Sequence, residues 1–406
     1  MSSQSHSNIR PTMESLGLQD TELNFPTSHN RIANFDPSVI RQDALDTRIV
    51  VHRDYPALVD QFLTLKRELG TTNEKRLYSQ SWTWKDQIAR LIEMRPLAFL
   101  TSQDSTLLRN GERVSRGTAF WDNMGAEGSD YTTLENYLTY DEIMLGSLLG
   151  VSSPSYFIND GNRYNRGEPQ EPGTFESRGI IIGLVGPRFE RLEHMDSNLI
   201  LNGVAKKRMH RRLRELYLDF FDLTELTKER FDTIVYMARM RITFEILLLE
   251  ANDRAKATGQ KAYVYVVGLG LGVWKCDRRQ PDLYVTAFHD TIYQLRDKLG
   301  HIGTIELAYI NTSQEIKGAL TTIARNQGIT VKFSKRNPAA KLGGEEADQL
   351  LVLSYAWDGN AFPGNEYWEG SLAGSGDPAA ACMSTIAELH NPLVNPNFLK
   401  RVHVLQ

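Results

Sequence analysis

The sequence predicts an α/β fold, with a three-layer α/β/α core around a mixed sheet, a helical region before it and a helical insertion within it. The chain has 406 residues, of which 41% are hydrophobic and 24% charged, so it can bury a sizeable core. Beyond residue 150, short apolar runs alternate with stretches of helical periodicity. Several runs are apolar throughout, which is typical of strands buried on both faces.

The chain divides into three parts. Residues 1–45 are rich in Ser, Asn, Asp and Pro and lack apolar periodicity, which predicts a disordered tail. Residues 46–145 show helical spacing and predict a helical N-terminal region. Residues 146–406 contain the strand-helix alternation and predict the main α/β domain. Within this domain, residues 203–257 are nearly all helical, longer than one crossover needs, and are interpreted as an insertion that covers one side of the sheet.

The expected elements follow from apolar periodicity and from helix start and stop residues. The expected helices cover about 54–69, 81–95, 134–149, 203–222, 225–257, 286–299, 313–326 and 378–389. The expected strands cover 156–158, 179–185, 262–267, 302–310, 329–333 and 349–355.

Composition excludes several classes of function. A net charge of −4 argues against nucleic acid or an anionic membrane as a partner, since both usually require a basic surface. No apolar run approaches the ~20 residues of a membrane span, and the polar N-terminus does not resemble a secretory signal. Cys276 and Cys382 are the only cysteines, so there is no disulfide framework or thiolate metal cluster. A reducing, cytoplasmic location is expected.

The first candidate site is the loop after the expected strand 156–158. Two Arg and three Asn side chains follow within ten residues, which is more donors than a simple turn needs. A solvated turn and contact with an anionic or ribosyl ligand both stay open. The candidate ligand-binding residues here are Phe157, Asn159, Gly161, Asn162 and Arg163.

The second candidate is a glycine-rich loop after the expected strand 262–267. Alternate glycines expose backbone N–H groups that phosphate oxygens can approach closely. The spacing matches neither a Walker A loop nor the GxGxxG fingerprint, and a close-packed strand end explains the glycines equally well. The candidate residues are Gly268, Gly270, Leu271 and Gly272.

The third candidate is the loop after the expected strand 349–355, which combines two carboxylates with Asn, aromatic and turn-forming residues. Aromatic rings can wall a flat ligand, and carboxylates among them can have shifted pKa values. Asp377, just before Pro378, is a typical helix N-cap, although a helix start also favours an anion. The candidates are Asp358, Glu366, Asp377, Trp357, Asn360, Phe362 and Asn365.

At these loops the sequence resembles the MavL-type atypical macrodomains, a group structurally akin to poly(ADP-ribose) glycohydrolase. The motifs that carry the resemblance are FINDGNRYNRG, GIIIGLVGPRFE, VVGLGLGVW, SYAWDGNAFPGNEYW and SGDPAAA, and it covers roughly residues 140–396. The resemblance implies a macrodomain-like domain that removes ADP-ribose from arginine of a modified protein, with ubiquitin as one candidate. It implies no metal and no cofactor.

Carried over by position, the catalytic acids of the family fall on Asp358, Glu366 and Asp377. The family uses aspartates, so glutamate at 366 is a departure. One carboxylate would activate the water that attacks the ribose C1″, and another would hold the guanidinium of the substrate. The segments 159–163 and 268–272 would cradle ADP-ribose. Trp357, Phe362 or Tyr367 would wall its ribose or adenine.

Two other functions remain compatible with these residues. A reader would bind ADP-ribose without turnover, which needs the glycine loop but not three acids. A hydrolase could also act on another ADP-ribosyl linkage. In each case the expected partner is ADP-ribose or an ADP-ribosylated protein, in the cytoplasm, or in the host cytoplasm for a secreted bacterial effector.

Overall fold

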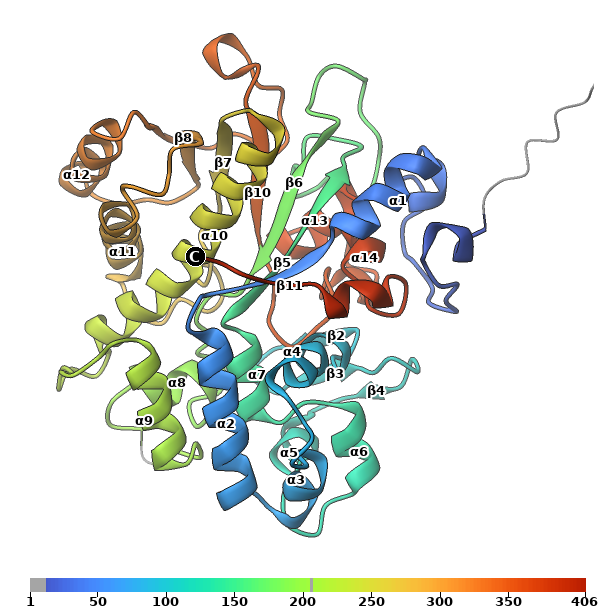
Figure 1. Cartoon of the computed structure of the whole chain (residues 1–406), viewed down its shortest axis with the longest axis vertical. Coiled ribbons are helices and arrows are strands. Elements are labelled where there is room, and N and C mark those ends of the chain that lie inside the picture. Colours follow the sequence, from blue (N-terminus) through green and yellow to red (C-terminus); the bar gives the residue numbers. More distant parts are fainter. Residues whose placement is uncertain (1–11, 205–206) are drawn as a thin grey trace, which may run out of the picture.

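The computed structural model of the chain describes residues 12–204 and 207–406. Its centre is an eight-stranded sheet in the order β11-β1-β5-β6-β10-β7-β8-β9 (Figure 1). The strands are β1 (Arg48–Val51), β5 (Leu149–Tyr156), β6 (Arg178–Leu184), β7 (Ala262–Val266), β8 (Ile302–Ala308), β9 (Thr330–Ser334), β10 (Leu350–Ala356) and β11 (Val402–Val404). Strands β6, β10, β7, β8 and β9 are mutually parallel, whereas β5 is antiparallel to β1 and β6. The predicted mixed sheet is confirmed.

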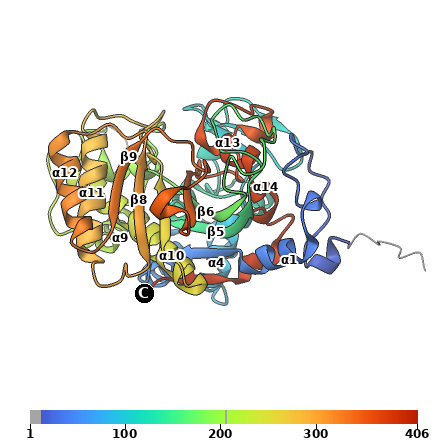
Figure 2. The ribbon, with the colours of Figure 1, turned by 90° about the horizontal axis from the view of Figure 1, so that it is seen from above.

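Helices pack on the sheet to form the expected layers. Figure 2 shows α11 and α12 on one side of the strands and α13 and α14 on the other. Helix α10 contacts most strands of the sheet, while α1, α13 and α14 contact β5 or β10. These helices are α1 (Pro37–Asp46), α10 (Thr233–Thr258), α11 (Gln280–Gln294), α12 (Gln314–Arg325), α13 (Gly376–Met383) and α14 (Ile386–Leu389).

The expected insertion over residues 203–257 is wrong for its larger part. Helix α10 connects β6 to the parallel β7, and its side chains are buried along most of its length. A crossover between parallel strands usually runs through such a helix, so α10 belongs to the core. The additional helices are α8 (Met195–Ile200) and α9 (Arg211–Phe220). No helix among the described residues is long and apolar enough to cross a membrane.

The region predicted as helical, residues 46–145, also contributes strands. Its helices are α2 (Tyr55–Leu69), α3 (Thr72–Leu77), α4 (Trp84–Glu93), α5 (Thr118–Asp122), α6 (Tyr131–Asn136) and α7 (Tyr140–Gly146). However, β1 pairs with β5 and β11 in the large sheet, and β2 (Ala98–Leu100), β3 (Ser105–Leu107) and β4 (Arg113–Val114) form a small one. The expected helix 134–149 is replaced by α6, α7 and the start of β5, which extends to Tyr156.

The disordered-tail prediction is wrong for residues 12–45, while residues 1–11 lie outside the described part of the chain. The Asn30 side chain donates to the carbonyl of Ala381 at 2.6 Å, and Arg31 pairs with Glu388 at 2.7 Å. Ile32, the next residue, is buried in a small apolar cluster. Polar anchors to α13 and α14, distant in sequence, therefore fix a segment that has little periodicity of its own.

Candidate active site

Three carboxylates meet where the loop that follows β10 joins the start of α13. Asp358, Glu366 and Asp377 each place a carboxylate oxygen within 4.8 Å of the other two. The chain turns back twice between them, at Gly359 and Gly364, whose φ angles of +75° and +87° suit glycine. The three acids that the sequence singled out are thus brought together.

Asn365 holds this cluster in place. Its side-chain amide donates to Asp358 at 3.2 Å and to the carbonyl of Phe99 at 3.1 Å, and its oxygen accepts from the Phe99 N–H at 2.7 Å. The backbone N–H groups of Gly364 and Asn365 donate to the Asp377 carboxylate at 3.0 and 2.7 Å. Strand β2, through Phe99, therefore supports the loop from the N-terminal region.

The N-cap interpretation of Asp377 is wrong. The N-cap of α13 is Ser375, without a side-chain capping bond, and the Asp377 carboxylate is directed instead at the backbone of the preceding loop. The Asp377 side chain is also buried, with 1% of its surface exposed. Its position couples the start of α13 to the acid cluster.

The electrostatics of the cluster favour proton transfer near neutral pH. Desolvation by the surrounding protein and the carboxylate of Glu366 raise the pKa of Asp358 to about 7, against the opposing hydrogen bond from Asn365. Desolvation and the charge of Asp358 also raise the pKa of Asp377 well above its ordinary value. Neighbouring carboxylates at such distances resist ionising together. A group with a pKa near 7 can both accept and return a proton.

Glu366 is the third member and is partly exposed, as Asp358 is. The Ser375 hydroxyl donates to its Oε2 at 3.1 Å. A cluster of this kind attracts a cation, and both a guanidinium and a divalent metal ion match its oxygen atoms. The expectation that the site needs no metal stays a prediction.

The glycine loop flanks the acid cluster, because β7 and β6 are the two neighbours of β10 in the sheet. A Cβ at Gly186, just after β6, would lie 2.4 Å from the backbone nitrogen of Gly270. Gly270 itself has φ +73° and packs against Pro187. Close packing therefore explains Gly270, whereas Gly272 faces open space.

The first loop leaves the sheet at the opposite end of the strands, since β5 is antiparallel to β6. Residues 157–167 therefore do not follow the strand ends from which the other two loops leave. The loop nevertheless reaches back to the acid loop. The N–H of Gly374 donates to the Arg163 carbonyl at 3.0 Å, and the Arg163 guanidinium lies 5.7 Å from the ring centre of Tyr309, which follows β8.

Within that loop, most polar groups serve the loop itself. The Asn159 amide donates to Asn165 and to the Glu168 carbonyl, and its oxygen accepts from the Gly161 N–H. The Asn162 side chain accepts from the Tyr164 N–H. Phe157 is 3% exposed, and a Cβ at Gly161 would clash with Met383 and Pro338. The ligand contacts expected of this loop stay a prediction.

The aromatic wall expected from the third loop is not formed by the rings named for it. Trp357, Phe362 and Tyr367 are buried. The Trp357 indole donates to the Ala361 carbonyl at 2.9 Å, and Tyr367 is hydrogen-bonded to Thr27 at 2.9 Å. These rings pack against protein because the loop folds over its own apolar side chains.

Two further candidates differ in environment, and two neighbouring residues escaped the sequence analysis. Leu271 packs against the main core. Asn360 is 1% exposed, and neither end of its amide has a partner among the described residues. Phe99 and Arg188 border the acids, yet neither carries a local motif that marks it; only the resemblance motif GPRFE includes Arg188.

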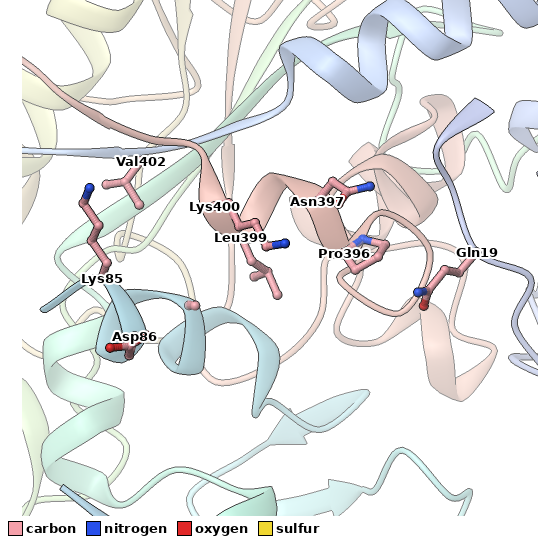
Figure 3. Close-up of a pocket in the computed structure, with 9 residues that line it drawn as sticks. Gln19, Lys85, Asp86, Pro396, Asn397, Leu399, Lys400 and Val402 are labelled. Carbon is pink, nitrogen blue, oxygen red and sulfur yellow. The ribbon is translucent and has the colours of Figure 1, made fainter. Parts of the chain in front are cut away.

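A cavity of about 550 Å³ lies elsewhere (Figure 3). It is lined by Gln19, Lys85, Asp86, Ala89, Pro396, Asn397, Leu399, Lys400 and Val402. None of these belongs to the candidate loops, and the cavity contains a single carboxylate. The chemistry is therefore expected at the acid cluster.

Comparison with known proteins identifies the family. The model of the family "ADP-ribosylhydrolase MavL-like" matches residues 18–211 and 206–405. The chain belongs to this family. It is 35% identical to the Drosophila melanogaster protein named ADP-ribosylarginine hydrolase CG3568, over 89% of this chain and 78% of that protein. It is 33% identical to ADP-ribosylarginine hydrolase CG2909 of the same organism, over 88% and 78%. The predictions of an enzyme and of the MavL-like family are confirmed.

Proposed function

We propose that the chain hydrolyses the bond between ADP-ribose and an arginine side chain of a modified protein. The observation that carries this proposal is the meeting of Asp358, Glu366 and Asp377 within 4.8 Å. A compact group of carboxylates suits a substrate whose leaving group is a guanidinium. The arginine specificity in the names of both relatives supports the same linkage.

Asp358 activates water in this proposal. In its ionised form it takes a proton from the water that attacks the ribose C1″, while the bond from C1″ to the guanidine nitrogen breaks. Asp358 then gives this proton to the departing guanidine, which becomes the protonated arginine side chain, so the reaction is balanced. A carboxyl with a pKa of about 7 can move between the two forms at neutral pH.

The other two acids have different tasks. Glu366, partly exposed, binds the guanidinium of the substrate before cleavage. Asp377, buried and bonded to two backbone N–H groups, positions the loop that carries Asp358 and Glu366. The departure from aspartate at position 366 lengthens the side chain that reaches the leaving group.

For the adenosine end we propose a second cavity, about 530 Å³, where β8 and β9 end. Tyr309 and Phe333 are among its lining residues, and aromatic faces suit a flat base. Arg163 lies against Tyr309 and connects this cavity with the acid loop. In this proposal Tyr309 and Phe333 form the aromatic wall. The rings first expected there, Trp357, Phe362 and Tyr367, are buried.

Ubiquitin, which the family resemblance suggests, is one candidate substrate. We propose a cytoplasmic protein, since Cys276 and Cys382 are both free thiols in the structure and a reducing compartment keeps them so.

The test offers the full chain two substrates, a protein ADP-ribosylated on arginine and one ADP-ribosylated on serine, with and without EDTA. We expect release of ADP-ribose from the arginine conjugate alone, unchanged by EDTA. ADP-ribosylated ubiquitin extends the same assay to the candidate partner.

Faster release from the serine conjugate would overturn the linkage. Loss of activity in EDTA, restored by Mg²⁺, would assign the acid cluster to a metal ion instead of a guanidinium. Release of ADP-ribose from the arginine conjugate by Asp358→Asn at the wild-type rate would contradict the mechanism.

A further inference from the structure

Arg188 is a buried arginine held rigidly beside the acid cluster. It follows β6 and is 4% exposed. Its Nε donates to Glu190 at 2.8 Å, and its Nη2 donates to the Thr101 carbonyl at 3.2 Å and pairs with Asp104 at 3.4 Å. The guanidinium also lies 4.4 Å from the ring centre of Phe99. Its orientation is therefore fixed without a ligand.

The remaining nitrogen of this guanidinium, Nη1, is buried and has no partner among the described residues. Buried donors that lack an acceptor are costly and rare in folded proteins. Asn360, in the acid loop, has a buried amide in the same condition. Asn360 lies in the loop after β10, the strand next to β6, so both unpartnered groups lie on loops that leave neighbouring strands.

The neighbours of Arg188 show where a ligand bound to it would lie. The ring of Phe99 lies against the Arg188 guanidinium. The backbone N–H of Phe99 donates to the side chain of Asn365, and the Asn365 amide donates to Asp358. On another side, the ring centre of Trp274, which follows the glycine loop, lies 5.9 Å from the guanidinium. Arg188 therefore stands between the catalytic acids and the glycine loop.

We propose that the Nη1 group of Arg188 binds an oxygen of the distal phosphate, the one attached to the ribose that is cleaved. A guanidinium matches phosphate oxygens in charge and geometry. The carboxylates of Asp358 and Glu366 suit the guanidinium of the substrate, so ADP-ribose lies toward Arg188 and the arginine of the substrate lies beyond the acids. The identity of the ligand rests on the proposed function.

The test measures binding of ADP-ribose, ADP and AMP to the full chain by calorimetry. For Arg188→Gln we expect a loss of about tenfold or more in affinity for ADP-ribose and ADP, and none for AMP, which lacks the distal phosphate. Arg188→Lys keeps the charge but not the planar fork of the guanidinium. Its affinity for ADP-ribose and ADP is expected to lie between those of the wild type and Arg188→Gln.

The matched control is Arg191→Gln. Arg191 pairs with the same Asp104 and also with Asp122, so its loss disturbs the same network. We expect a lower Tm with unchanged affinity for ADP. Equal loss of affinity in the Arg188 and Arg191 variants would reduce Arg188 to a structural role and overturn the proposal.

Other outcomes are equally decisive. A loss confined to ADP-ribose would assign the contact to the distal ribose and overturn the phosphate assignment, and so would an equal loss for AMP. If the wild type binds ADP through Arg188 but releases no ADP-ribose from arginine conjugates, the proposed function fails while the phosphate contact stands.

Discussion

Glu250 and Asp377 are both buried carboxylates, yet their environments have opposite effects. Glu250, on α10, is 0% exposed and pairs with Arg48 of β1 and with Arg254, each at 2.7 Å. Burial alone would raise its pKa, but the two arginines lower it to about 2. Asp377 is 1% exposed and has Asp358 and Glu366 as charged neighbours, so its pKa rises.

The comparison shows that burial alone does not mark a functional acid. Glu250 joins α10 to the sheet through cations that compensate its charge, which is a structural arrangement. The carboxylates of the acid cluster bond to backbone and amide donors and form no ion pair with an arginine among the described residues. This disfavours their ionised form in the folded state and is typical of functional sites. Variants of the two groups should therefore separate stability from activity.

The largest effect is expected for Asp358→Asn. The variant keeps the size and the hydrogen-bonding capacity toward Asn365 but cannot accept a proton, so kcat should fall by ~10²–10⁴-fold. Release of ADP-ribose from an arginine conjugate measures this. Glu306→Gln, which alters a buried acid paired with Arg336, is the control and should retain kcat. Full activity in Asp358→Asn would sink the mechanism.

The acid cluster was predictable because its members lie close together in sequence. Asp358, Glu366 and Asp377 lie within twenty residues, in the loop after β10 and the start of α13, so local turns at glycines bring them close. The parallel strands were predictable for a similar reason: each is a continuous apolar run, and β6 to β10 begin and end within two residues of the prediction.

Features that depend on distant segments were not predictable. Strand β11 has three partly exposed residues and exists because it pairs with β1, some 350 residues away. Residues 12–45 are ordered by contacts with α13 and α14. Arg188 is positioned by its contacts with Phe99 and Asp104, which are distant in sequence, and no local pattern marks any of the three. Likewise, burial of Trp357 and Phe362 follows from the loop's tertiary packing, which composition does not reveal.

The second-largest effect is expected for Glu250→Gln. Removal of the charge leaves Arg48 and Arg254 uncompensated, so the free energy of unfolding at pH 7 should fall by about 3 kcal/mol. Urea unfolding measures this, and kcat of the folded enzyme should stay at the wild-type value. Equal loss of activity and stability would erase the contrast between the two groups.

The pH dependence of this difference provides a control. The folded-state pKa of about 2 lies below the ordinary value of 4.5. The stabilisation by Glu250 is therefore complete above pH 4.5 and is lost as the pH falls from 4.5 to 2. Wild type and Glu250→Gln should converge in acid. A constant difference between them would show that lost packing, and not charge, causes the effect.

The third effect has the opposite sign. The folded-state pKa of Asp358, about 7, lies above the ordinary value of 3.8. Its contribution to stability is therefore present below pH 3.8 and is lost as the pH rises to 7. At pH 8, Asp358→Asn should unfold with a free energy about 1–3 kcal/mol higher than wild type, measured by urea unfolding. No gain at pH 8, or the same gain at pH 4, would contradict the carboxylate repulsion.

The smallest effect is expected for Glu366→Gln, and it separates substrate binding from catalysis within the cluster. Glutamine retains an oxygen for the Ser375 hydroxyl but loses the charge that pairs with the guanidinium of the substrate. KM for the arginine conjugate should rise about tenfold, with a smaller change in kcat. Affinity for free ADP-ribose should stay unchanged, because that ligand has no guanidinium. Equal losses for the conjugate and for ADP-ribose would place Glu366 on the ADP-ribose side of the acids, contradicting its assignment to the leaving group.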